Sequence, residues 1–73
     1  MVRKFHVILQ SEKEGGFSAF VPALPGCASQ GETEEEALQN VKEAIELYLE
    51  GLEMDQQSIP VDDVHFKEIE IAA

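Results

Sequence analysis

The chain has 73 residues, and its fifteen acidic side chains outnumber five basic ones, giving a formal net charge of −10. A chain of this length buries only ~60% of the surface that its unfolded form exposes, so we expect one small domain over residues 1–73 that gains stability by association between copies. The negative charge disfavours direct binding to nucleic acid and favours a basic protein partner, although acidity also serves solubility alone.

The cysteine content and the N-terminus indicate the compartment. Cys27 is the single cysteine, which excludes an intramolecular disulfide and a zinc site built mainly from cysteines. A lone thiol is typical of the reducing cytoplasm. The N-terminal apolar run is short, is interrupted by His6 and lacks a signal-peptide cleavage site, and no stretch is long enough to span a bilayer. We therefore expect a soluble cytoplasmic protein without membrane contact.

The first two predicted elements are strands joined as a hairpin. Residues 2–10 alternate between apolar and polar side chains, which is typical of a strand with one buried face. The charged segment SEKEGG that follows predicts a long hairpin loop. A second strand is predicted at residues 16–21, and it ends before Pro22 because proline has no N–H to donate.

A turn separates the second strand from the third. In the segment LPGC, Pro25 presets φ at the second turn position and Gly26 accepts a positive φ at the third. This pattern predicts a type II turn that leads into a short strand at residues 27–31, which begins at Cys27.

The segment TEEE predicts the start of a helix. The Thr33 hydroxyl can cap free N–H groups, and Glu36 can reach back to complete a capping box. Carboxylates in this first turn also lie at the positive end of the helix dipole. Downstream apolar residues recur at about 100° per residue, so we expect a helix over about residues 34–52 with an acidic outer side.

The C-terminal residues predict a last strand at residues 64–71. The alternation changes phase inside it, because Val64 and Phe66 share one parity whereas Ile69 and Ile71 share the other. Either a bulge lies near residues 67–68 or only the final part joins the main sheet. The expected architecture is an α+β fold of order β-β-β-α-β, with a three-stranded antiparallel meander, a returning strand and one helix across one face.

The candidate chemical groups favour structural roles. Cys27 would need a base to act as a nucleophile, and only His6 and His65 are available, so we expect a small, partly buried strand residue instead. The cluster Asp62-Asp63-x-His65 matches no calcium or zinc spacing and is expected to be a solvated turn. Carboxylates for a nuclease of the ribonuclease H class are missing from residues 2–10. We therefore expect a non-enzymatic protein without metal or cofactor.

Two features indicate a binding surface. Leu47 is an apolar residue within the polar arc of the helix. The second face of the predicted sheet carries apolar side chains, and no helix remains to cover them. Glu46 and Glu50 are like charges at i, i+4, which costs helix stability unless a cation compensates. The candidate interface residues, for a partner or a second subunit, are His6, Ile8, Phe20, Glu43, Glu46, Leu47 and Glu50.

An ordered series of motifs carries a family resemblance. The motifs are GFSAFVP at residues 16–22, LPGC at 24–27, SxGET at 29–33, EAL at 36–38 and NVKEAIELYLE at 40–50. In this combination the sequence resembles the HicB family of antitoxins over about residues 2–52, and more loosely over the last predicted strand.

The resemblance implies a role in a toxin–antitoxin system. HicB-like proteins bind HicA, a small basic toxin with a double-stranded-RNA-binding fold that cleaves mRNA with a histidine. The implied fold is a partial ribonuclease H fold without catalysis, and the implied mechanism is occlusion of the toxin's RNA-binding and catalytic surface. Many HicB proteins carry a C-terminal DNA-binding module, for which this sequence has no room after the last predicted strand, so operator binding is not expected.

The sequence thus leaves two functions from different classes, and a weaker third. The leading hypothesis is an antitoxin that self-associates to a dimer or tetramer and occludes a basic HicA-like toxin. The alternative is a stand-alone homo-oligomeric interaction module with no toxin-neutralising role. The third is a residual metal-dependent nuclease that uses Asp62 and Asp63.

Overall fold

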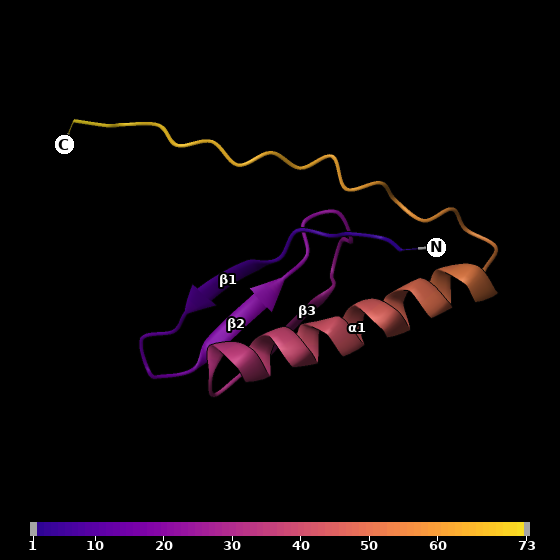
Figure 1. Cartoon of the computed structure of the whole chain (residues 1–73), viewed down its shortest axis with the longest axis horizontal. Coiled ribbons are helices and arrows are strands. Elements are labelled where there is room, and N and C mark those ends of the chain that lie inside the picture. Colours follow the sequence, from indigo (N-terminus) through magenta and orange to yellow (C-terminus); the bar gives the residue numbers. More distant parts are fainter. Residues whose placement is uncertain (1, 73) are drawn as a thin grey trace.

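The computed structural model describes residues 2–72 and shows a three-stranded antiparallel sheet with one helix against one of its faces (Figure 1). The strands are β1 (Ile8–Ser11), β2 (Phe17–Phe20) and β3 (Ala28–Gly31), in the spatial order β1-β2-β3, and the helix is α1 (Glu34–Met54). The predicted α+β class, with a meander followed by a helix, is therefore confirmed.

The first two strands are shorter than the alternation of side chains predicts. β1 begins at Ile8 rather than at residue 2, because its partner β2 ends at Phe20, which lies opposite Ile8. Residues 2–7 lead into β1 but have no neighbouring strand to pair with. Alternation shows which side chains share a face, but the ends of a strand depend on where its partner ends.

The predicted turn joins β2 to β3. The backbone N–H of Cys27 donates to the carbonyl of Leu24 at 3.0 Å, and Gly26 has a φ of 82°, as a type II turn requires at its third position. The turn brings the chain back so that the N–H of Val21 donates to the carbonyl of Cys27 at 3.0 Å. β3 itself begins one residue later than predicted, at Ala28.

The start of α1 is fixed by side-chain hydrogen bonds. The hydroxyl of Thr33 accepts from the backbone N–H of Glu36 at 3.1 Å, and a carboxylate oxygen of Glu36 accepts from the N–H of Glu32 at 3.1 Å. The second bond reaches one residue beyond the cap itself, but it satisfies a free donor at the helix entrance in the same way. Local sequence therefore determines where α1 begins.

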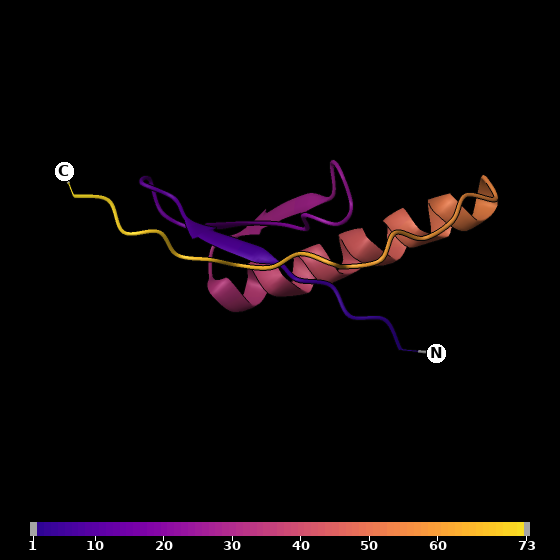
Figure 2. The same cartoon turned by 90° about the horizontal axis from the view of Figure 1, so that it is seen from above.

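The far end of α1 extends beyond the sheet. The helix has 21 residues, a length of ~32 Å at 1.5 Å per residue, whereas each strand has four residues and spans ~13 Å. Its last turn ends at Met54, two residues later than predicted, and the N–H of Gln57 donates to the carbonyl of Leu52 at 2.8 Å. Figure 2 shows this C-terminal half running past the strands.

The core lies between the sheet and the first half of α1. Its buried side chains come from β2, the turn before β3 and the inner face of α1; they are Ala19, Val21, Leu24, Cys27, Ala37 and Val41. Most are small, and a Cβ atom at Gly31 would lie 2.5 Å from the backbone nitrogen of Ala37. The helix therefore packs closely on β3 and β2 and diverges from β1.

The predicted C-terminal strand at residues 64–71 is wrong for this structure, because the described residues after α1 contain no strand. The segment runs extended beside the N-terminal residues, in the same direction as β1 (Figure 1). The carboxylate of Asp62 accepts the backbone N–H groups of both His6 and Val64. Because a side chain takes these donors, no backbone ladder forms where the segment meets the N-terminal residues.

Candidate functional site

The outer face of α1 carries an acidic stripe that includes exposed apolar side chains. Glu43, Leu47, Glu50 and Met54 follow one another at helical spacing, and we call them the outer stripe. Leu47 is 70% exposed and Met54 is 78% exposed, so both leave a large apolar area in solvent between carboxylates. The predicted residues Glu43, Leu47 and Glu50 are thus brought together on one surface, and Met54 extends it.

Glu46 lies on a different flank of the helix. It lines a groove between α1 and the N-terminal segment, together with Lys42 and Arg3. Among the described residues, no ion pair joins Glu46 to Lys42 or Arg3, so the two bases are only its neighbours along the groove wall. Glu46 is therefore not part of the outer stripe.

The open face of the sheet holds a narrow apolar row. Ile8 of β1 lies opposite Phe20 of β2, which lies opposite Ala28 of β3, and Phe20 is 39% exposed. The neighbouring row across the three strands is polar, with Gln10 opposite Ser18 and Ser18 opposite Gln30. The uncovered sheet face is consequently apolar in one row only.

His6 does not lie free on this sheet face. Its Nδ1 atom is 3.0 Å from the Oδ2 atom of Asp62, and its ring meets that of Phe66 edge to face with centroids 5.2 Å apart. Both partners belong to the C-terminal segment, so His6 holds that segment against the N-terminal residues.

The predicted interface residues therefore fall into separate surfaces. The open sheet face with Ile8 and Phe20 points away from α1, whereas the outer stripe points away from the sheet, on the other side of the molecule (Figure 2). One flat partner surface cannot cover both.

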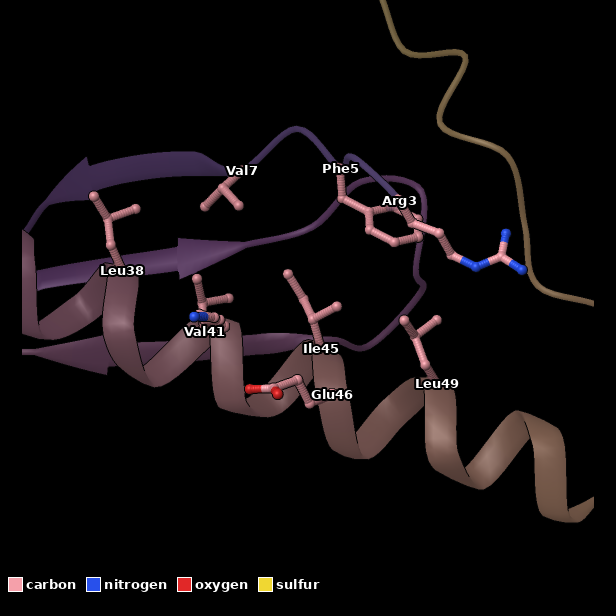
Figure 3. Close-up of a pocket in the computed structure, with 9 residues that line it drawn as sticks. Arg3, Phe5, Val7, Leu38, Val41, Ile45, Glu46 and Leu49 are labelled. Atoms are coloured by element: carbon pink, nitrogen blue, oxygen red, sulfur yellow. The ribbon is translucent and has the colours of Figure 1, made fainter. Parts of the chain in front are cut away.

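A groove that the sequence analysis misses lies at the β1 side of the helix (Figure 3). It has a volume of about 570 Å³, and Phe5 and Val7 form one wall. The other wall is α1, which contributes Leu38, Val41, Ile45 and Leu49. The spacing of these residues in the sequence is that of core positions, so it does not indicate a groove. The one signal in the sequence is the small residue Gly31, which lets α1 approach β3 closely and so leaves the β1 side open.

The carboxyl group of Asp62 is almost covered, with 6% of the side chain exposed. The hydrogen bond from the backbone N–H of His6 is the main cause that lowers its pKa, and the N–H of Val64 and the His6 ring act in the same direction. Burial opposes them by raising the pKa. The group thus serves as an ionised anchor for the C-terminal segment.

The structure gives Cys27 no catalytic surroundings. The thiol is buried, and burial raises its pKa, whereas a nucleophilic cysteine needs a lowered one. Among residues 2–72, no three histidine, cysteine, aspartate or glutamate side chains converge on a point that could hold a metal ion. Asp62, from the predicted Asp62-Asp63-x-His65 cluster, is engaged with His6 instead.

Comparison with known proteins identifies the family. The sequence profile described as "HicB_like antitoxin of bacterial toxin-antitoxin system" matches residues 5–70. The chain belongs to the HicB-like antitoxin family. The match includes most of the C-terminal segment as well as the sheet and helix, so the outer stripe, the open sheet face and all of the groove except Arg3 lie within the family's region of this HicB-like protein.

Relatives of similar length support this membership. A UPF0150 protein of Synechocystis is 47% identical over 70 residues, which cover 96% of this chain and 89% of the relative. One of Thermoplasma acidophilum is 47% identical over 60 residues, covering 82% and 87%. One of Helicobacter pylori is 65% identical over 43 residues, covering 59% and 60%. No helix within residues 2–72 of this HicB-like chain has the length and apolar character needed to cross a membrane.

Proposed function

We propose that this HicB-like protein is a non-enzymatic antitoxin that binds a small basic, mRNA-cleaving toxin of the HicA type and covers its RNA-binding surface. Family membership carries the proposal, since the matching profile describes antitoxins of toxin–antitoxin systems. The net charge of −10 supports a basic partner, because a basic RNA-binding surface is attracted to an acidic protein as it is to RNA.

The outer stripe is the surface that suits such a toxin best. Its carboxylates, Glu43 and Glu50, flank exposed Leu47, so a partner gains both charge pairing and an apolar contact. The stripe lies on one rigid helix, which costs little conformational entropy on binding. We assign the toxin contact to this stripe and inhibition to physical occlusion.

Co-expression with the adjacent small basic open reading frame tests the proposal. We expect the pair to co-purify and growth to be restored when this chain is co-expressed with the toxin. The double variant Glu43→Lys/Glu50→Lys should lose both, whereas the matched control Glu14→Lys/Glu68→Lys makes the same charge change away from α1 and should keep both. An absent neighbouring gene, or a pair that neither co-purifies nor restores growth, contradicts the antitoxin function.

A second candidate is an assembly module whose main partner is itself. The exposed apolar side chains after α1, above all Ile69 and Ile71, favour it, because a group of exposed apolar side chains is typical of a surface that contacts another chain. This candidate differs from the first in requiring no toxin. Purified chain that self-associates but protects no cell from the neighbouring gene product would establish it in place of the antitoxin.

A further inference from the structure

The segment after α1 ends in an extended arm that makes few contacts with the rest of the chain. We define the C-terminal arm as residues 61–72. It is attached through Asp62 and Phe66, which both contact His6. Beyond that attachment Ile69 is 82% exposed and Ile71 is 76% exposed, and none of the arm's described backbone forms a strand. The arm therefore presents apolar side chains and free backbone groups together.

One edge of the sheet is already protected. α1 packs along β3, and the side-chain amide of Asn40 donates to the carbonyl of Gln30 at 2.7 Å. That carbonyl belongs to the central part of β3, so a helix side chain takes a position that an additional strand would need. Natural sheets commonly protect an edge in this way.

The edge of β1 is open. Glu12 lies opposite Gly16 in the register of β1 and β2, and its N–H donates to the carbonyl of Gly16 at 3.0 Å. Because hydrogen-bonded pairs alternate along antiparallel strands, the even-numbered residues of β1 face β2 with their backbone groups. The backbone groups of Leu9 and Ser11 therefore point to the outer edge, where the structure provides no strand.

The apolar groove adjoins this open edge. Val7 and Phe5 lead directly into β1 and form the upper wall in Figure 3, while Leu38 of α1 faces them. A strand added beside β1 would place every second side chain on the helix side of the sheet, over the groove. Ile69 and Ile71 are two residues apart, so both point to the same face, and a register that places one of them over the groove places the other there as well.

The charges of the arm and of the β1 region are complementary. Residues 3–13 contain three bases and one acid, although the chain as a whole is strongly acidic. Residues 61–72 contain four acids and one base. Two copies of the chain that associate through these segments therefore avoid the repulsion expected from their net charge.

We propose that the C-terminal arm of one copy adds as a strand to the open edge of β1 in a second copy, with Ile69 and Ile71 over that copy's apolar groove. Residues 62–66 stay tied to His6 of their own chain, so the residues beyond them are the part that reaches across. Exchange is reciprocal in a two-fold dimer, and each copy supplies one arm and accepts one. This dimer is independent of the proposed toxin contact, because it uses another side of the molecule.

Sedimentation equilibrium of purified full-length variants tests the dimer without any toxin. We expect the wild type to have twice the mass of one chain. Ile69→Lys/Ile71→Lys should raise the dimer dissociation constant by at least about 100-fold, because apolar area that the dimer buries is lost on both arms. The control Leu47→Lys/Met54→Lys makes the same change at equally exposed helix positions and should stay dimeric. A monomeric wild type, or an arm variant that dimerises like the wild type, would overturn the proposal.

Cross-linking distinguishes exchange between copies from closure within one chain. A mixture of full-length Ser11→Cys and Ile69→Cys chains, treated with a short bismaleimide, should give a cross-linked heterodimer. Buried Cys27 contributes little reaction. A mixture of Ser11→Cys with Met54→Cys should give far less. If the mixture gives none and the double variant Ser11→Cys/Ile69→Cys links only within single chains, each arm closes its own edge and the exchanged dimer is wrong.

Discussion

Gly31 controls how closely the helix approaches the sheet. A Cβ atom there would lie 2.5 Å from the nitrogen of Ala37 and 2.8 Å from the carbonyl carbon of Glu36, and both are backbone atoms that cannot rotate away. The tight contact on the β3 side is also what leaves the β1 side open. One missing side chain thus bears on both the core and the groove.

Gly31→Ala should therefore destabilise the fold by about 1–3 kcal/mol, the usual cost of overpacking. Gly51→Ala is the matched control, since a Cβ at Gly51 meets nothing within 4 Å. Because Gly51 lies inside α1, alanine there should be neutral or stabilise the fold by up to about 1 kcal/mol. Urea denaturation curves for the two variants measure the difference, and equal stabilities would contradict the role given to Gly31.

Asp62 makes attachment of the arm sensitive to acid. Hydrogen bonds hold its folded pKa below the ordinary value of 3.8, so the carboxylate contributes stability above that value and loses it as the pH falls through the lowered folded pKa. The contacts of Phe66 with His6, followed by NMR, should therefore weaken only in strong acid. Asp62→Asn should weaken them at every pH at which the wild-type carboxylate is ionised, whereas Asp63→Asn, at the exposed neighbouring position, should behave like the wild type.

Residue-level predictions from sequence succeed where the interaction is local. The turn at Pro25-Gly26 and the cap formed by Thr33 and Glu36 depend on residues within four positions of one another, and the structure contains both. The contact of His6 with Asp62 joins residues 56 positions apart. No periodicity or spacing indicates such a pair, because tertiary folding alone brings them together.

The start of α1 is the element boundary with the clearest local cause. Thr33→Ala removes the oxygen that accepts the N–H of Glu36 and should destabilise the protein by about 1 kcal/mol. Thr33→Ser keeps a hydroxyl at the same place and should retain most of the stability. Thermal unfolding followed by circular dichroism measures both, and an alanine variant as stable as the serine variant would show that the cap contributes nothing.

The type and order of the first four elements were predictable from sequence, whereas the residues at which strand pairing begins and ends were not. Alternation identifies the strand at β1, yet Ile8 begins it because β2 supplies no partner for earlier residues. The same reasoning explains the missing C-terminal strand. The spacing of Ile69 and Ile71 shows that their side chains share a face, but it does not show that a neighbouring strand is present to pair with them. A strand pattern without a partner in its own chain is itself informative, because it indicates where a second chain would pair.

At the scale of the whole molecule, two proposed contacts occupy different sides. The β1 edge and the apolar groove lie on the flank of the helix–sheet layer, while the outer stripe faces away from the sheet. In a reciprocal two-fold dimer both outer stripes therefore remain available. One dimer can then bind two toxin molecules, one on each helix.

This arrangement predicts that dimerisation and toxin binding can be separated by mutation. Ile69→Lys/Ile71→Lys should be monomeric and still bind one toxin per chain, whereas Glu43→Lys/Glu50→Lys should remain dimeric and lose the toxin. Toxin association with the wild type should also slow as salt is raised, because screening weakens the attraction between an acidic chain and a basic partner. Light scattering gives the stoichiometry and stopped-flow fluorescence gives the rates. If the arm variant lost toxin binding while remaining folded, the two surfaces would be coupled, and the toxin would contact the dimer as a unit rather than each helix alone.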